Sequence, residues 1–224
     1  MTWNIAGTFF NMLEKVATEY NLSDRPGNIF NIDESGIQIN NKPDFLKKKK
    51  FQKCSCFNIG RKTEYITVQW QHAVVLQANF CPIIFNDVNI KQQFGDGLPP
   101  RSDVYVNRKS SYLSTDLFIT WITQRFLKHR DSGEVILLIN CNTAYCSYPL
   151  MLHTAVANNG TIIRLPYHYT HTLESSDKCF FGPLRSHFKN KSTSCTIPRY
   201  RMARHMGFAW SRVASVSVGV SEFE

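Results

Sequence analysis

The chain has 224 residues, and 43% of them are hydrophobic, a fraction that is ordinary for one globular domain and does not suggest disorder. Lys and Arg number 26 against 17 Asp and Glu, so the net charge of +9 favours polyanionic partners, above all nucleic acid. No apolar run approaches the roughly 20 residues that a membrane-spanning helix needs, and no secretory signal opens the chain. We therefore expect a soluble, intracellular protein with no membrane partner.

Cysteine spacing gives little sign of a disulfide framework or a metal site. The seven cysteines are odd in number and irregularly spaced, which fits reduced thiols in the cytosol or nucleus. Cys54 and Cys56 could form half of a zinc site, but no matching Cys or His pair follows at the spacing of a zinc finger. Buried or surface thiols are therefore the favoured interpretation, and structural zinc is the weaker alternative.

The first elements of the chain are a helix and a short strand. Phe9, Leu13 and Val16 recur at helical spacing, and a loop follows them. Residues 29–33 are then predicted to form a strand that ends in the acidic pair Asp33-Glu34.

A strongly basic loop is expected after this strand. Its cations lie on a solvated face or contact phosphates, and the two interpretations have equal weight. The basic residues of this loop are Lys47, Lys48, Lys49, Lys50, Lys53, Arg61 and Lys62.

The remaining elements alternate between strands and helices. Ser114 begins a good N-cap region, and Asn159-Gly160 is a helix stop. Gly182-Pro183 is expected to bend or interrupt the helix that contains it. The predicted strands are 65–76, 79–85, 134–140 and 161–165, and the predicted helices are 117–129, 149–158, 177–189 and roughly 199–213.

This order of elements predicts an α/β fold with a central mixed five-stranded sheet flanked by helices, which is also the order of the ribonuclease H-like fold. Two-metal nucleases need carboxylates that converge from separate elements to hold two divalent ions. In this layout the positions concerned are the end of the first strand, the end of the fourth strand and the start of the helix after the fifth. They are occupied by Asp33, Asn140 and Asp177.

Four blocks, in the right order, resemble the DDE-type nuclease core of pogo/Tigger/jerky transposases. Residues 30–36 (FNIDESG) are similar to the family's opening block, and 137–140 (LLIN) resemble the strand that carries its second aspartate. Residues 165–173 (LPYHYTHTL) and the FGPLR segment after Asp177 resemble the two blocks around its third aspartate. The resemblance spans almost the whole chain.

The resemblance implies a catalytic set of Asp33, the degenerate Asn140 and Asp177, with Asp33 and Asp177 as ligands of Mg²⁺ or Mn²⁺. It implies DNA as the partner and the nucleus as the location. The hypothesis of DNA binding also rests on the net charge of +9, the basic loop and the segment from Arg185 to Arg212, with Arg185 and Lys189 as expected contacts to nucleic acid. It divides the chain into an N-terminal helix and linker, 1–28, and a nuclease core, 29–224, that is cut short at its C-terminal end.

Several positions depart from the family pattern, and Asn140 matters most because an amide lacks the charge of the second aspartate. We therefore expect a DNA-binding domain whose strand cleavage is lost. The alternative is an active divalent-metal-dependent endonuclease in which Glu174 replaces the missing ligand; a remnant that folds poorly is a third interpretation. Four further residues are expected to lie behind the metal ligands and to support them: Glu34, His168, His171 and Glu174.

Overall fold

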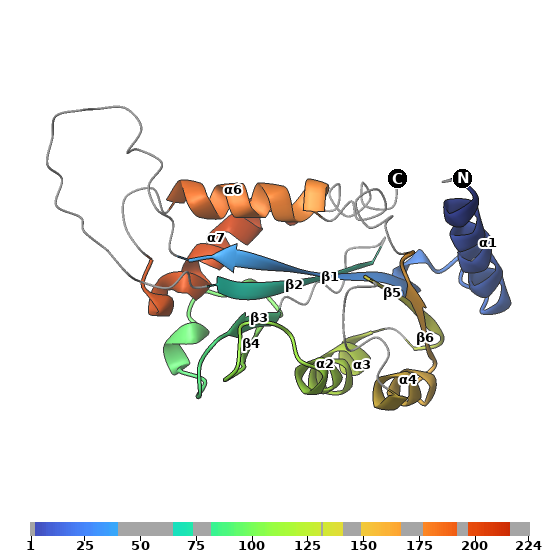
Figure 1. Cartoon of the computed structure of the whole chain (residues 1–224), viewed down its shortest axis with the longest axis horizontal. Coiled ribbons are helices and arrows are strands. Elements are labelled where there is room, and N and C mark those ends of the chain that lie inside the picture. The colour runs from blue at the N-terminus through green and yellow to red at the C-terminus, as the bar shows by residue number, and fades with distance from the viewer. Residues whose placement is uncertain are drawn as a thin grey trace, which may run out of the picture.

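The computed structural model describes residues 3–39, 65–73, 82–130, 132–140, 149–166, 177–191 and 197–215. Its centre is a six-stranded sheet of order β4-β3-β2-β1-β5-β6 with helices on both faces (Figure 1). The strands are β1 Ile29–Gln38, β2 Tyr65–Ala73, β3 Pro82–Phe85, β4 Asp103–Val106, β5 Val135–Ile139 and β6 Gly160–Arg164.

The direction of the strands identifies the fold. β1, β2 and β3 form an antiparallel meander, and β5 and β6 lie parallel to β1 on its other side. This is the strand arrangement of the ribonuclease H-like fold, so the predicted α/β class and mixed sheet are confirmed. The predicted number of five strands was wrong. The strand that was not predicted is β4, a half-buried edge strand of four residues that pairs parallel with β3.

β1 is also longer than predicted. It does not end at Asp33-Glu34 but continues to Gln38, because β2 pairs with it along its whole second half. Ile37, near the far end of the strand, is buried on the same side as Asp33. Asp33 therefore lies in the middle of a central strand rather than at its end.

Helices cover the two faces of the sheet in two layers (Figure 1). One layer contains α1, Trp3–Glu19; α6, Gly182–Lys191, preceded by the π-helical turn η6, Asp177–Phe181; and α7, Met202–Val213, preceded by the 3-10 turn η7, Arg199–Arg201. The other contains α2, Thr115–Trp121; the π-helical turn η4, Ile122–Phe126; α3, Leu127–His129; and α4, Pro149–Val156. Short 3-10 turns η1, Pro26–Asn28, and η3, Gln92–Phe94, complete the described elements. No described helix combines the length and apolarity that crossing a membrane would require.

Three clusters of buried side chains hold these layers together. The largest lies between β1–β3 and the α6–α7 pair and includes Ile37, Phe181 and Trp210. A second joins Phe30 and Trp121 on the opposite face. The third packs α1 against β5 and β6, so the predicted N-terminal helix lies directly on the sheet. Burial of apolar area on both faces explains why β5 is a continuous apolar strand.

Two helix ends follow the local sequence signals. The Ser114 hydroxyl accepts a hydrogen bond from the Leu117 N–H at 3.3 Å, which confirms the predicted N-cap. Asn159, after α4, has a φ of 55°, the left-handed conformation that often ends a helix. At Gly182 the π-helical turn changes to α-helix, so the helix type changes where an interruption was predicted.

The position of α7 depends on a close approach between two glycines. Gly97, in the turn after η3, has a φ of 78°, and a Cβ added at Gly207 of α7 would lie 2.1 Å from the Gly97 carbonyl oxygen. Only glycine allows this contact between the helix and the backbone of the turn.

We expect Gly207→Ala to lower the free energy of unfolding by about 1–3 kcal/mol, because the added methyl group forces the helix and turn apart. Urea denaturation measures the change. Gly7→Ala is the matched control: Gly7 is in helix α1, and its added Cβ would meet no atom of the described residues within 4 Å. The control should gain about 0.5–1 kcal/mol. Equal stabilisation by both substitutions would contradict the described contact.

Candidate functional site

Asp33 lies on the face of the sheet that α6 covers. It occupies the middle of β1 and is buried, with 8% of its surface exposed. Its Oδ1 accepts the backbone N–H of Glu34 at 2.8 Å. Ile37, four residues further along the strand on the same side, packs with α6 and α7, and Phe30 and Ile32 point to the opposite face.

Asn140 is brought next to Asp33 by the parallel pairing of β1 and β5. Ile32 is the register partner of Ile139, so one further step along both strands places Asn140 beside Asp33 on the same face. β5 ends at Ile139, and Asn140 follows directly and is half-buried. The structure therefore brings these two predicted residues together.

Asp177 is the first residue of η6, the turn that leads into α6. Phe180, Phe181 and Leu184 anchor this turn and helix in the core cluster below them. The backbone of Asp177 thus opens the helix that lies over the face carrying Asp33 and Asn140.

Arg185 of α6 reaches down to the same face of β1. Its Nη1 donates to Ser35 Oγ at 2.9 Å, two residues along the strand from Asp33. Arg185 is half-buried, and Lys189, one turn further along the helix, is exposed. Both residues were predicted to contact nucleic acid. Arg185 places its positive charge near the part of β1 that contains Asp33, and Lys189 is exposed to solvent.

Glu34 points away from Asp33, to the opposite face of the sheet, as expected for a continuing strand. It pairs across the strands with Gln69, and its Oε2 and both polar atoms of the Gln69 amide are buried with no hydrogen-bond partner among the described residues. Burial raises the pKa of the Glu34 carboxyl to about 7. Its predicted role as a support of Asp33 is thus limited to the backbone N–H that Asp33 accepts.

The donors at the β1–β5 pair do not fit two tightly bound divalent ions. Mg²⁺ prefers oxygen ligands, and a two-metal site needs several carboxylates. Asp33 offers one carboxylate and Asn140 one neutral amide oxygen. Within the described ranges, no three His, Cys, Asp or Glu side chains gather into a group that could hold a metal ion.

Other predicted site residues lie outside the described residues. These are His168, His171, Glu174 and the basic loop from Lys47 to Lys62.

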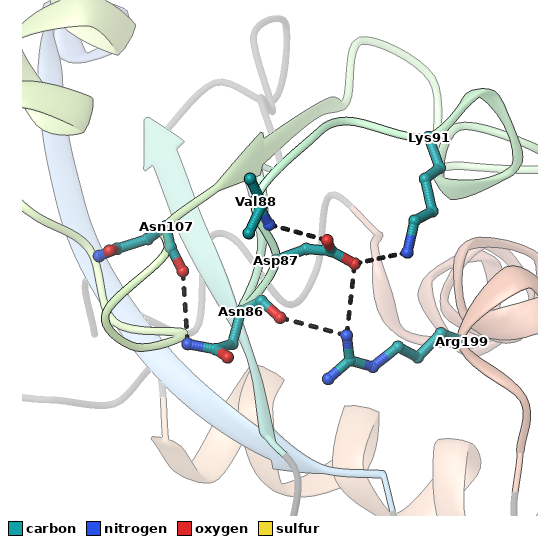
Figure 2. A network of polar contacts seen from close by, with 6 residues as sticks. All are labelled: Asn86, Asp87, Val88, Lys91, Asn107 and Arg199. Carbon is teal, nitrogen blue, oxygen red and sulfur yellow. Dashed lines mark hydrogen bonds and ion pairs between the residues drawn. The ribbon is translucent and has the colours of Figure 1, made fainter.

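The sequence did not single out a polar network that joins three distant segments. Asp87 accepts hydrogen bonds from Lys91 and Arg199, and Asn86 and Asn107 extend the network on one side (Figure 2). The spacing of Asp87 and Lys91 could have suggested one of these pairs, but nothing local in the sequence links Asp87 to Arg199.

Comparisons with known proteins give weak similarity. No protein-family model and no curated protein matches the chain. Among solved structures, the chain is similar to that of a pre-cleavage Mos1 transpososome, with 11% identity and a TM-score of 0.37 over 93% of this chain and 61% of that one. It is also similar to the Mos1 transposase in a paired-end complex with the left transposon end, with 11% identity and a TM-score of 0.40 over 93% and 60% of the two chains. The chain thus spans about three fifths of the length of these structures.

Proposed function

We propose that this chain is a transposase-derived DDE domain that binds DNA and has lost strand cleavage. The observation that carries the proposal is that the register of β1 and β5, which ends at Ile32 and Ile139, places Asn140 next to Asp33, so that a neutral amide follows one strand beside the carboxylate of the other. The four sequence blocks support derivation from the pogo/Tigger/jerky group. A nuclear location and weakened binding of Mg²⁺ or Mn²⁺ belong to the same proposal.

The chemistry of the pair explains the loss of cleavage. A carboxylate and a divalent ion about 4 Å apart attract each other by about 4 kcal/mol per unit charge at an effective dielectric near 20. The Asn140 amide lacks this charge. Neither the fold nor the positive charge of the chain depends on a carboxylate at position 140. DNA binding is therefore expected to persist when metal binding is weakened.

Wild-type protein is expected to bind duplex DNA with an affinity that falls steeply with salt, because phosphate neutralisation releases counterions. Fluorescence anisotropy between about 50 and 200 mM salt measures the dependence, with the logarithm of affinity falling by roughly 0.9 per phosphate contact for each unit of log salt. An affinity that stays constant over this range would exclude phosphate neutralisation as the basis of binding.

The same protein is expected to leave supercoiled plasmid intact in Mg²⁺ or Mn²⁺. Asp33→Ala is the control, since nicking that persists in this variant comes from a contaminating nuclease. Nicking by the wild type that disappears in Asp33→Ala would show that cleavage is retained, and the substitute-ligand interpretation with Glu174 would replace this proposal.

A further inference from the structure

α7 has two sharply different faces. Met202, Met206 and Trp210 are buried against the sheet. On the outer face, Arg201, at the end of η7, and Arg204 and Arg212 are exposed. Arg201, Arg204 and Arg212 are separated by three, eight and eleven positions, and at about 100° per residue these spacings keep them within an arc of about 80° on one side of the helix. Arg201 and Arg212 are about 16 Å apart along the axis at 1.5 Å per residue. These three arginines with Tyr200 and Phe208 are called the α7 outer face below.

The positive charge of this face is not neutralised within the described structure. Residues 178–221 contain eight Lys or Arg and no Asp or Glu. None of Arg201, Arg204 and Arg212 makes an ion pair with a described residue, whereas Arg125 pairs with Asp103. Asp96, exposed next to Gly97, and Asp87, which pairs with Arg199, are described acids at the edges of this region. The α7 outer face is therefore a line of cations with an electrostatic preference for a polyanion.

Aromatic rings support two of the three guanidinium groups. Arg201 lies over the Tyr200 ring, 5.6 Å from its centroid, and Arg212 lies over the Phe208 ring at 5.2 Å. A guanidinium stacked on a ring keeps its N–H edge available for a phosphate oxygen while its rotation is restricted. Tyr200 itself is 49% exposed. These contacts lower the entropy cost of ordering long side chains on a ligand.

The start of the α7 outer face is fixed by Asp87. Its Oδ2 lies 2.8 Å from Lys91 Nζ and 3.4 Å from Arg199 Nη1, and Arg199 Nη1 also donates to the Asn86 carbonyl at 3.2 Å (Figure 2). The hydrogen bonds from Lys91 and from the Val88 N–H hold the pKa of Asp87 below its usual value. The carboxylate thus remains charged and ties η7 to the turn after β3.

We propose that the α7 outer face binds the phosphate backbone of duplex DNA through Arg201, Arg204 and Arg212, and that Asp87 is a positioning residue for it. This inference rests on the proposed function and names the surface that performs it. Duplex DNA carries one negative charge per roughly 1.7 Å of axis, so a line of arginines about 16 Å long spans several phosphates. Phosphate contacts of this kind position the protein and carry no sequence information.

A pair of triple variants tests the surface. Arg201→Gln, Arg204→Gln and Arg212→Gln together remove three charges from the α7 outer face. Arg108→Gln, Lys109→Gln and Lys128→Gln remove three exposed charges elsewhere on the chain. In the first variant the slope of log affinity against log salt should become less negative by about 2.7, roughly 0.9 for each phosphate contact that is lost. The second variant should keep the wild-type slope.

The outcomes separate the two proposals. If the wild type shows no salt-dependent binding, the proposed function itself fails. If the wild type binds and the α7 variant keeps its slope, or if both triple variants lose it equally, only the assignment to the α7 outer face is overturned. Circular dichroism checks that each variant is folded.

Asp87→Asn tests the positioning role through the sign of its effect. The substitution makes the protein more positive by one charge, so simple attraction predicts tighter binding. Release of Arg199 predicts severalfold weaker binding. Asp24→Asn, exposed and outside the network, adds the same charge and should bind at least as tightly as the wild type. Tighter binding by Asp87→Asn would overturn the positioning role.

Discussion

Asn140→Asp is expected to tighten Mg²⁺ or Mn²⁺ binding by about a thousandfold, because a second carboxylate beside Asp33 adds about 4 kcal/mol of attraction per unit charge at 4 Å. Asp33 and Asn140 are neighbours on one face of the β1–β5 pair, so the new carboxylate and the old one can share an ion. Isothermal titration calorimetry measures the affinity, and nicking of supercoiled plasmid should become detectable in the same variant.

The control for Asn140→Asp is Gln124→Glu, at an exposed position of η4 in the helical layer on the other face of the sheet. It adds an equal charge away from Asp33 and Asn140 and should leave metal affinity at the wild-type level. The double variant Asp33→Ala, Asn140→Asp should lose the gain. If Asn140→Asp binds metal no more tightly than the wild type, Asp33 and Asn140 do not form a shared site.

Stability is expected to fall as the pH rises from about 5 to about 8, with Glu34 contributing about 3 kcal/mol of the decrease. Burial raises the pKa of Glu34 from 4.5 to about 7. The folded protein therefore keeps a proton that the unfolded chain releases in this range. The stability that comes from the protonated carboxyl is complete below about pH 4.5 and is lost as the pH passes through 7.

Glu34→Gln should remove this part of the pH dependence, because the amide does not titrate. Urea denaturation at several pH values, in EDTA to exclude metal ions, gives the free energy of unfolding for both proteins. Glu14→Gln is the matched control on the exposed side of α1 and should retain the wild-type dependence. A decline in Glu34→Gln as steep as in the wild type would mean that the carboxyl is not buried as described.

Elements with a strong periodic pattern could be predicted from the sequence. The apolar run of β5 and the alternating faces of α7 each indicate one structure, and Ser114 marks a helix start by its own hydrogen bond. β4 has only four residues, too few for a clear period, and it was missed. The second half of β1 contains Ser35 and Gly36, which favour a turn locally, and pairing with β2 overrides that preference.

The candidate site could be predicted where strand order alone decides it. Parallel central strands place residues at corresponding positions side by side, so the meeting of Asp33 and Asn140 follows from the order of elements. The contact of Arg185 with Ser35 spans 150 residues, and that of Arg199 with Asp87 spans 112. No local pattern reports such pairs, because they depend on how helices pack on the finished sheet.

The position of Asp33 and Asn140 has a consequence for folding. β1, β2 and β3 pair with neighbours in the chain, and β5, α4 and β6 form a second local unit. The two units meet along β1 and β5, where Asn28 also donates to the Glu134 carbonyl, 106 residues away. Closing such a long segment costs more entropy than forming either unit, so we expect this junction to form last. Asp33 and Asn140 then come together only in the final step, and hydrogen exchange of the β5 amides reports on the integrity of the site.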